Sequence, residues 1–135
     1  MEHSRILLFI TIMLISFAGL ALRSSEARGA AVITKEDNGK EITIPQGDIF
    51  EVHLQQHGGT GYLWQIVDPD ETHLKVLEST EAPLKQEGIM GGPLLRTWKI
   101  KAAKAGQTNL KILLYRPWEG TGKAAESFAV KIQIR

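Results

Sequence analysis

The chain has 135 residues, a formal net charge of +1 and no cysteine. This length suits one domain with its own core, and the lack of cysteine excludes disulfide bridges, thiolate zinc sites and a thiol nucleophile. The balanced charge gives no electrostatic basis for binding nucleic acid or an anionic membrane surface. We therefore expect a single domain that is held together by its core and has no nucleic-acid partner.

Residues 1–27 have the pattern of a secretory signal peptide. A basic start precedes an uncharged apolar run over residues 6–22, and Ser25 and Ala27 supply small residues for a cleavage site. Cleavage after Ala27 would leave a mature domain of residues 28–135, secreted or periplasmic and no longer in contact with a membrane. The apolar run is also just long enough to span a bilayer, so an uncleaved membrane anchor is the alternative.

From Ala31 onward, apolar and polar residues alternate with a period of two, which predicts strands rather than helices. Asn38-Gly39 is typical of a tight hairpin and would join the first two strands. Leu74 and Val76 are expected to point inward from the fifth strand. The segments with this pattern are residues 31–34, 41–44, 49–55, 62–67, 73–79, 95–103, 109–115 and 126–135. Seven to eight short strands separated by turn signals indicate an all-β antiparallel sandwich without disulfides.

Three connections between these strands are longer or more unusual than a sandwich requires. The first is glycine-rich, from His57 to Gly61; the second is residues 86–93, with Ile89 and Met90; the third begins with Arg116-Pro117-Trp118. Apolar side chains on glycine-flanked loops are typical of protein-binding surfaces.

Each connection also has an ordinary structural interpretation. The first would be a bulged hairpin, the second a flexible linker, and the third a Trp packed over a sheet edge with an Arg stacked on it. Tyr62, Trp64 and Trp98 are interpreted as core residues because they alternate with polar neighbours.

Catalytic and cofactor motifs find no support in the sequence. Gly58 to Gly61 lacks the spacing of a dinucleotide fingerprint, and Gly120 to Ala124 lacks the hydroxyl and the following helix of a phosphate loop. His53 and His57 are four residues apart, a spacing that shares one face of a helix but does not bring two ligands together at the end of a strand, so a zinc site is not supported. No serine lies in a nucleophile elbow. We therefore expect no enzyme activity, no metal and no cofactor.

The three connections, taken in order, resemble those of the chagasin-like inhibitors of papain-family cysteine peptidases. The matching motifs are Gly-Thr-Gly-Tyr-x-Trp at 59–64, a glycine-rich stretch ending at Gly92, and Arg-Pro-Trp at 116–118. The resemblance implies an immunoglobulin-like sandwich, a monomer, whose three loops form a wedge that blocks the peptidase cleft reversibly. Within that wedge, Trp118 would stack on the enzyme, and Arg116 would pair with enzyme acids or brace its own loop.

The residues that the resemblance assigns to the peptidase contact are His57, Gly58, Gly59, Thr60, Gly61 and Tyr62 in the first loop, Gly88, Ile89, Met90, Gly91 and Gly92 in the second, and Arg116, Pro117 and Trp118 in the third.

The first loop departs from the family pattern. The family reads Asn-Pro-Thr where this chain has His57-Gly58-Gly59, so Thr60 supplies the one hydroxyl that remains. Weaker or differently targeted inhibition is therefore expected. The alternative function is a non-inhibitory immunoglobulin-like binding module of the cell envelope.

Overall fold

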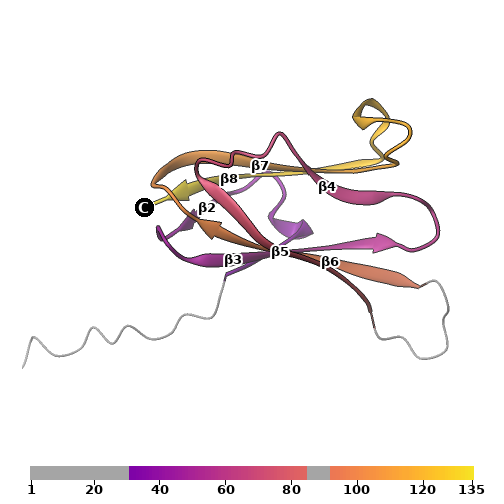
Figure 1. Ribbon diagram of the computed structural model, residues 1–135, viewed down its shortest axis with the longest axis horizontal. Helices are drawn as coiled ribbons and strands as arrows, with labels where there is room; N and C mark the ends of the chain where they lie inside the picture. The colour runs from indigo at the N-terminus through magenta and orange to yellow at the C-terminus, as the bar shows by residue number, and fades with distance from the viewer. Residues whose placement is uncertain (1–30, 85–91) are drawn as a thin grey trace, which may run out of the picture.

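The computed structural model describes residues 31–84 and 92–135. Eight strands form two four-stranded sheets that pack face to face (Figure 1). The strands are β1 (Val32–Thr34), β2 (Glu41–Ile44), β3 (Ile49–His57), β4 (Leu63–Val67), β5 (Leu74–Pro83), β6 (Pro93–Ala102), β7 (Gly106–Tyr115) and β8 (Glu126–Ile134). Two short 3-10 turns, η2 (Lys35–Asp37) and η3 (Thr121–Lys123), complete the described structure, in which no helix is long and apolar enough to cross a membrane. The predicted all-β sandwich is confirmed.

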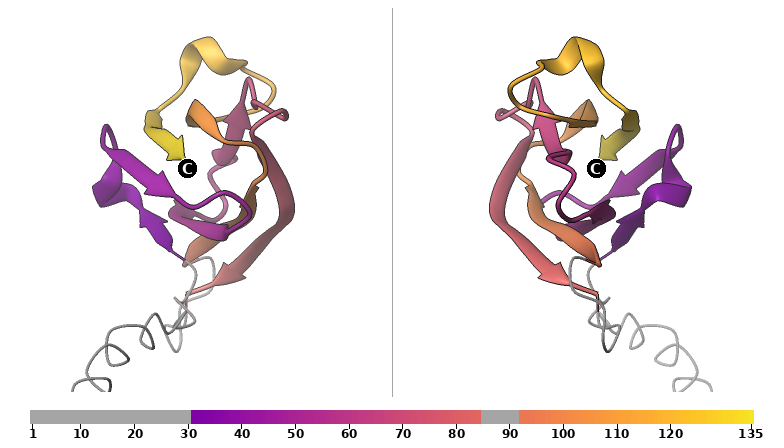
Figure 2. Two further views of the ribbon diagram at one scale, coloured as in Figure 1. Left: turned by 90° about the vertical axis from the view of Figure 1, so that its left-hand side faces the viewer. Right: turned by 90° about the vertical axis from the view of Figure 1, so that its right-hand side faces the viewer.

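The strand order is β1-β3-β6-β5 in the first sheet and β2-β8-β7-β4 in the second. Four pairs, β3–β6, β4–β7, β5–β6 and β7–β8, are antiparallel, as predicted. The edge pairs β1–β3 and β2–β8 are parallel, so the prediction of a wholly antiparallel sandwich is wrong at these two edges. The reason is that the chain crosses from one sheet to the other after β1. Seen end-on, the N-terminal strands lie along one side of the sandwich and β5 along the other (Figure 2).

The predicted hairpin at Asn38-Gly39 is also wrong, because β1 and β2 lie in different sheets. The turn itself forms, with Gly39 at a φ of 81°. It is attached to β8 instead: the Ala129 N–H donates to Asn38 Oδ1 at 2.9 Å, and the Gly39 N–H donates to the Ala129 carbonyl at 2.7 Å. A two-residue turn signal fixes the local backbone but does not specify which sheet the next strand joins.

The core consists of the inward residues of both sheets, and most of them follow the predicted alternation. Among those with 0–1% exposure are Phe50, Val52, Leu54, Phe128, Val130, Ile132 and Ile134. Each such side chain contributes about 1.5–3 kcal/mol by leaving water. Trp64 and Trp98 are 1% and 3% exposed, which confirms that they are core residues. Tyr62 was expected in the core, but it is partly exposed and lies beneath Arg116.

Strand β5 differs from its prediction in length and in burial. It continues to Pro83 because β6 pairs with it as far as Leu94. Val76 was expected to be buried, but it is 47% exposed, next to a bulge at Leu77. The short β4 does not cover this side, so Val76 faces an open groove of about 560 Å³ between the two sheets, which Ile66 also lines.

Candidate functional site

The first and third connections meet at one end of the sandwich, and the described flank of the second lies beside them. His57, the last residue of β3, lies opposite Pro93, the first residue of β6. Leu63 at the start of β4 lies opposite Tyr115 at the end of β7. We call this end, formed by residues 57–62 and 116–119, the loop end; it lies on the right of Figure 1, away from the C-terminus, and faces the viewer in the right panel of Figure 2.

The first connection crosses from one sheet to the other, because β3 and β4 belong to different sheets. The bulged-hairpin interpretation is therefore wrong. Gly59 and Gly61 have φ values of 77° and 81°, a conformation that favours glycine. The hydroxyl of Thr60 closes the turn: it donates to the His57 carbonyl at 3.1 Å and accepts from the Tyr62 N–H at 3.3 Å.

Arg116 joins the third connection to the first. Its Nε donates to the Thr60 carbonyl at 3.0 Å, and its Nη1 donates to Glu119 Oε1 at 3.1 Å. The guanidinium carbon lies 4.4 Å from the centroid of the Tyr62 ring and 5.9 Å from that of Trp118. Arg116 thus braces the two connections through intramolecular contacts, one of the two roles considered for it from the sequence.

Trp118 packs against the first connection and still faces solvent. A Cβ on Gly61 would overlap the six-membered ring of Trp118, so the ring lies directly on the Gly61 backbone. The side chain nevertheless remains 72% exposed. The predicted alternative, a Trp packed over a sheet edge, is replaced by a Trp packed over a glycine of the neighbouring loop.

The second connection is described only at its flanks. The Leu84 N–H donates to the Pro93 carbonyl at 3.0 Å and closes the base of the β5–β6 pair. Of the residues assigned to the peptidase contact, Gly92 is described, and Gly88, Ile89, Met90 and Gly91 lie outside the described residues.

Residues 43–132 match the family model described as "Chagasin family peptidase inhibitor I42". The chain belongs to the chagasin family. Members of this family are inhibitors of cysteine proteases rather than enzymes, so the expectation that the chain is not an enzyme is confirmed. The chain is 27% identical to Amoebiasin-2 of Entamoeba histolytica over 104 residues, which are 77% of this chain and 85% of that one. It is 24% identical to Chagasin of Trypanosoma cruzi over 106 residues, which are 75% of this chain and 94% of that one.

Solved structures agree with the fold of this chagasin-family chain. The crystal structure of the cysteine protease inhibitor EhICP2 from Entamoeba histolytica superposes with a TM-score of 0.72 at 25% identity, over 78% of this chain and 96% of that one. The structure of PbICP-C in complex with falcipain-2 gives a TM-score of 0.51 at 22% identity, over 78% and 91%. The immunoglobulin-like sandwich expected from the resemblance is confirmed.

Sequence reasoning missed the polar support beneath the first connection of this chagasin-family chain. Gln56 is 2% exposed and contacts both β4 and β5. The Trp64 indole Nε1 donates to the carbonyl of the neighbouring Gln55 at 2.8 Å. The alternation gave a signal that could have found it, because Gln56 follows Phe50, Val52 and Leu54 at an inward position where an amide needs partners.

No metal centre is present at the loop end of the described structure, where no three His, Cys, Asp or Glu side chains gather. His53 Nε2 lies 3.2 Å from Glu51 Oε1, on the outer face of the first sheet. The available chemistry is therefore that of a binding surface: an aromatic tip, a braced cation and a glycine-rich backbone.

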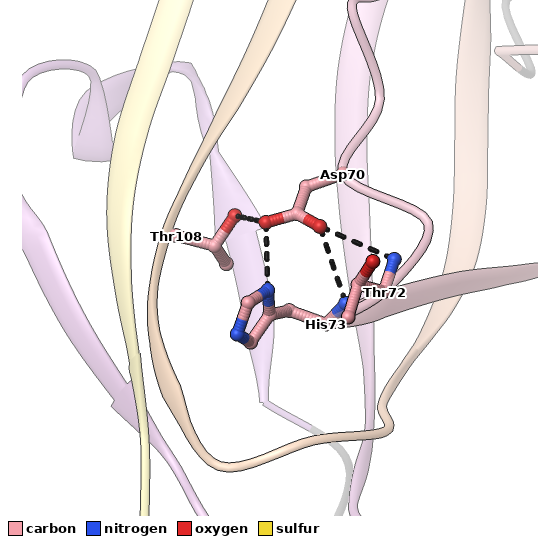
Figure 3. A network of polar contacts seen from close by, with 4 residues as sticks. All are labelled: Asp70, Thr72, His73 and Thr108. Carbon is pink, nitrogen blue, oxygen red and sulfur yellow. Dashed lines mark hydrogen bonds and ion pairs between the residues drawn. The ribbon is translucent and has the colours of Figure 1, made fainter.

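A second polar network joins loops at the opposite end of the sandwich (Figure 3). Asp70 Oδ2 accepts from Thr108 Oγ1 and contacts His73 Nδ1, each at 2.8 Å. Asp70 Oδ1 accepts from the backbone N–H groups of Thr72 and His73, at 3.2 and 3.3 Å. The Thr108 hydrogen bond and the contacts with His73 hold the pKa of Asp70 below its ordinary value. The network ties the β4–β5 connection to β7.

Proposed function

We propose that this chain is an exported, monomeric and reversible inhibitor of papain-family cysteine peptidases, and that its loop end enters the active-site cleft. The observation that carries the proposal is the state of Trp118. Its side chain is 72% exposed, yet Arg116 and the Gly61 backbone hold it in place. An exposed aromatic group that is already ordered loses little conformational freedom on binding, which favours its use as an interface anchor.

The charge of Arg116 supports this role for Trp118. Two of its five N–H donors are used within the protein, by the Thr60 carbonyl and by Glu119, whose carboxylate also balances the charge, so the brace needs no acid on the enzyme. We propose that Arg116 fixes the position of the third connection relative to the first. Trp118 and the backbone of residues 58–61 would make the direct contacts with the peptidase.

Resistance to cleavage follows from the same hydrogen bonds. The carbonyl oxygens of His57 and Thr60 accept from the Thr60 hydroxyl and from Arg116 Nε. A peptidase would have to break these bonds before either carbonyl could enter its oxyanion hole in attack geometry. The loop would therefore occupy the cleft as a poor substrate.

Related proteins support the type of partner. EhICP2 is described as a cysteine protease inhibitor, and PbICP-C was solved in complex with falcipain-2. The first connection supports a target or an affinity that differs from that of family members with the full motif. Gly59 has a φ of 77°, which would strain the threonine that the family pattern places there. The backbone of this loop therefore follows a path that suits glycine and not the family motif.

Export is proposed from residues 1–27, as a cleaved signal peptide. Cleavage after Ala27 would leave intact every strand from β1 onward. Expression of the full chain in a secreting host, followed by mass measurement of the product, tests the cleavage. A full-length product retained in the membrane would support the anchor instead.

Inhibition is tested by titrating purified residues 28–135 against papain and a cathepsin-type peptidase. We expect reversible, competitive inhibition, a one-to-one complex and a monomeric free inhibitor in size-exclusion chromatography. Trp118→Ala is the matched variant, since an exposed side chain can be removed with little effect on folding. If no papain-family peptidase is inhibited at tens of micromolar, the proposal is wrong.

The envelope-module alternative has one favourable observation, the open groove between β4 and β5. It lies on the side of the sandwich, and the exposed Val76 and Leu77 are among its lining residues. Binding of a non-peptidase protein that is lost in Val76→Ser and retained in Trp118→Ala would favour this alternative.

A further inference from the structure

Gln56 is a polar side chain at a position that the strand pattern reserves for the core. It is 2% exposed. Its Nε2 donates to Glu81 Oε1 at 2.9 Å, and its Oε1 accepts from the Trp64 backbone N–H at 3.1 Å. A buried amide that lost either partner would carry the full cost of its desolvation, so the two bonds strongly select this arrangement.

The two partners also fix the orientation of the amide. The Trp64 N–H can only donate and must face the Gln56 oxygen, whereas the ionised carboxylate of Glu81 can only accept and must face the nitrogen. Exchanging the two ends of the amide would break both hydrogen bonds. Gln56 therefore has a single conformation that satisfies β4 and β5 together.

The position of Gln56 matters because side chains, and no backbone ladder, join the two ends of the first connection; the Trp64 indole that donates to the Gln55 carbonyl is the other such link between β3 and β4. The ends of the first connection leave β3 and enter β4, which lie in different sheets and share no ladder of backbone hydrogen bonds. The connection itself contains Gly58, Gly59 and Gly61, which add little stiffness. The distance between its two ends must therefore be set by side chains beneath it.

Glu81 extends the frame across the first sheet. It lies on β5, separated from β3 by β6. Arg96 of β6 lies opposite Glu81, with its Nη1 3.4 Å from Glu81 Oε1, and its guanidinium carbon lies 5.1 Å from the centroid of the Trp98 ring. The same carboxylate oxygen, Glu81 Oε1, thus accepts from both Arg96 and Gln56.

We propose that Gln56 is a positioning residue of the loop end, with Glu81 as its anchor. It sets where the first connection leaves β3 and enters β4, and so it orients residues 57–62 for the peptidase cleft. This inference rests on the proposed function and adds to it a residue that lies behind the contact surface.

The decisive variant is Gln56→Glu. It places a second carboxylate against Glu81, and the repulsion is expected to open the frame. If a smaller fraction of molecules then holds the binding-competent loop, the apparent affinity falls by that fraction. We expect the inhibition constant to rise about tenfold, mainly through slower association.

The rescue is the double variant Gln56→Glu with Glu81→Gln. The carboxylate at 56 accepts from the Trp64 N–H and from the new amide at 81, so both hydrogen bonds return with one of them reversed in direction. We expect the inhibition constant to return to within about threefold of wild type. That difference in binding free energy is smaller than the roughly 1.4 kcal/mol of a tenfold change.

Two controls separate positioning from general destabilisation. Glu78→Gln makes the same chemical change as Glu81→Gln, on the same strand. Glu78 pairs with Lys99 at 3.5 Å on the outer face, so inhibition should not change. Ile132→Val removes a methylene from the core on β8, where Ile132 is 0% exposed, so it should lower stability and leave the inhibition constant unchanged.

Amide hydrogen exchange over residues 57–64 gives a readout that does not depend on any peptidase. Gln56→Glu should accelerate exchange there, and the double variant should restore it. If wild type inhibits no peptidase, the proposed function fails, and this exchange result still decides whether Gln56 frames the loop. If wild type inhibits and Gln56→Glu inhibits equally well, or Glu81→Gln does not rescue it, the inference is overturned. Should Gln56→Glu not fold, Gln56→Met is measured instead, with the same expected loss.

Discussion

The two ends of the sandwich use opposite charges for the same structural task. At the loop end, the cation of Arg116 joins two connections through the Thr60 carbonyl and Glu119. At the other end, the anion of Asp70 joins the β4–β5 connection to β7 through Thr108 and His73. In each case, one branched side chain with several hydrogen-bonding atoms replaces the backbone ladder that separate sheets lack.

The two networks differ in what they leave exposed. Around Asp70, the partner Thr108 is only 7% exposed. Around Arg116, the bracing contacts leave Trp118 72% exposed. The comparison indicates that the Asp70 network serves stability and the Arg116 network serves presentation of a surface. Substitutions in the Asp70 network should change stability without changing inhibition, and removal of the exposed Trp118 side chain should do the reverse.

Trp118→Ala should give the largest loss of inhibition for the smallest loss of stability. Loss of an interface anchor of this kind costs about 2 kcal/mol or more, so the inhibition constant should rise about 30-fold. The melting temperature should hardly move, because the side chain is mostly exposed. Enzyme titration and thermal denaturation measure both. A change in inhibition smaller than about threefold would return Trp118 to a structural role.

Gly61→Ala tests whether the placement of Trp118 depends on the neighbouring loop. The new methyl group would overlap the Trp118 ring, and the φ of 81° would be strained for alanine. We expect the inhibition constant to rise about tenfold, with a stability loss of about 1–2 kcal/mol from the strain.

Gly59→Ala is the matched control for that variant. Gly59 has a similar φ of 77°, but no atom lies within 4 Å of a Cβ placed there. It should show the same strain in thermal denaturation and a smaller loss of inhibition. Equal losses of inhibition in both variants would contradict a role for the contact between Gly61 and Trp118.

Arg116→Lys tests the brace itself. Lysine keeps the positive charge but cannot donate to Thr60 and Glu119 as a planar fork while stacking on Tyr62. We expect the inhibition constant to rise about fivefold, through the two weakened hydrogen bonds. Inhibition is measured at low and high salt, since loss of geometry is independent of salt and loss of charge pairing with an enzyme is not. A strongly salt-dependent defect would indicate that Arg116 meets acids of the peptidase.

Asp70→Asn should have the smallest effect on inhibition and a clear effect on stability. An amide has a single acceptor oxygen, so it cannot accept from Thr108 on one side and from the backbone N–H groups of Thr72 and His73 on the other. The melting temperature should therefore fall by a few degrees. The inhibition constant should stay at the wild-type value. A loss of inhibition would show that the two ends are coupled.

The pH dependence of this variant has a definite sign. The folded-state pKa of Asp70 lies below its ordinary value of 3.8, chiefly through the Thr108 hydrogen bond. The carboxylate therefore stabilises the fold fully above its unfolded pKa and loses that contribution as pH falls through the lower folded pKa. The stability difference between wild type and Asp70→Asn should shrink on acidification below about pH 4, as measured by denaturant unfolding.

Much of the fold could be predicted from the sequence because burial follows a period of two. Phe50, Val52 and Leu54 are buried where the alternation places them. The pairing of edge strands could not be predicted in this way, since Asn38-Gly39 gives a turn but not a partner. Val76 shows the same limit: alternation directs it inward, but the short β4 leaves that side of the sandwich open.

The candidate site divides in a similar manner. The motifs at residues 59–64 and 116–118 identified both connections, since glycine and proline interrupt the alternation of the strands there. The brace could not be predicted, because the contact between Arg116 and Thr60 joins residues 56 positions apart. Gln56 carried a local signal, an amide at an inward position, but its partner Glu81 is defined only once β5 and β6 are paired.

The pairing of β2 with β8 has a consequence for how the protein forms. Glu41 and Ile44 lie beside Lys131 and Ile134, so the second strand of the chain finds its neighbour only in the last strand. The second sheet therefore cannot close until synthesis has reached β8, and until then the apolar face of β2 has no cover. Such distant pairing slows folding and leaves apolar surface exposed on the incomplete chain. Removal of residues 126–135 should accordingly leave β2 without a partner and β7 paired with β4 alone, and abolish the fold, even though the loop end would keep its entire sequence.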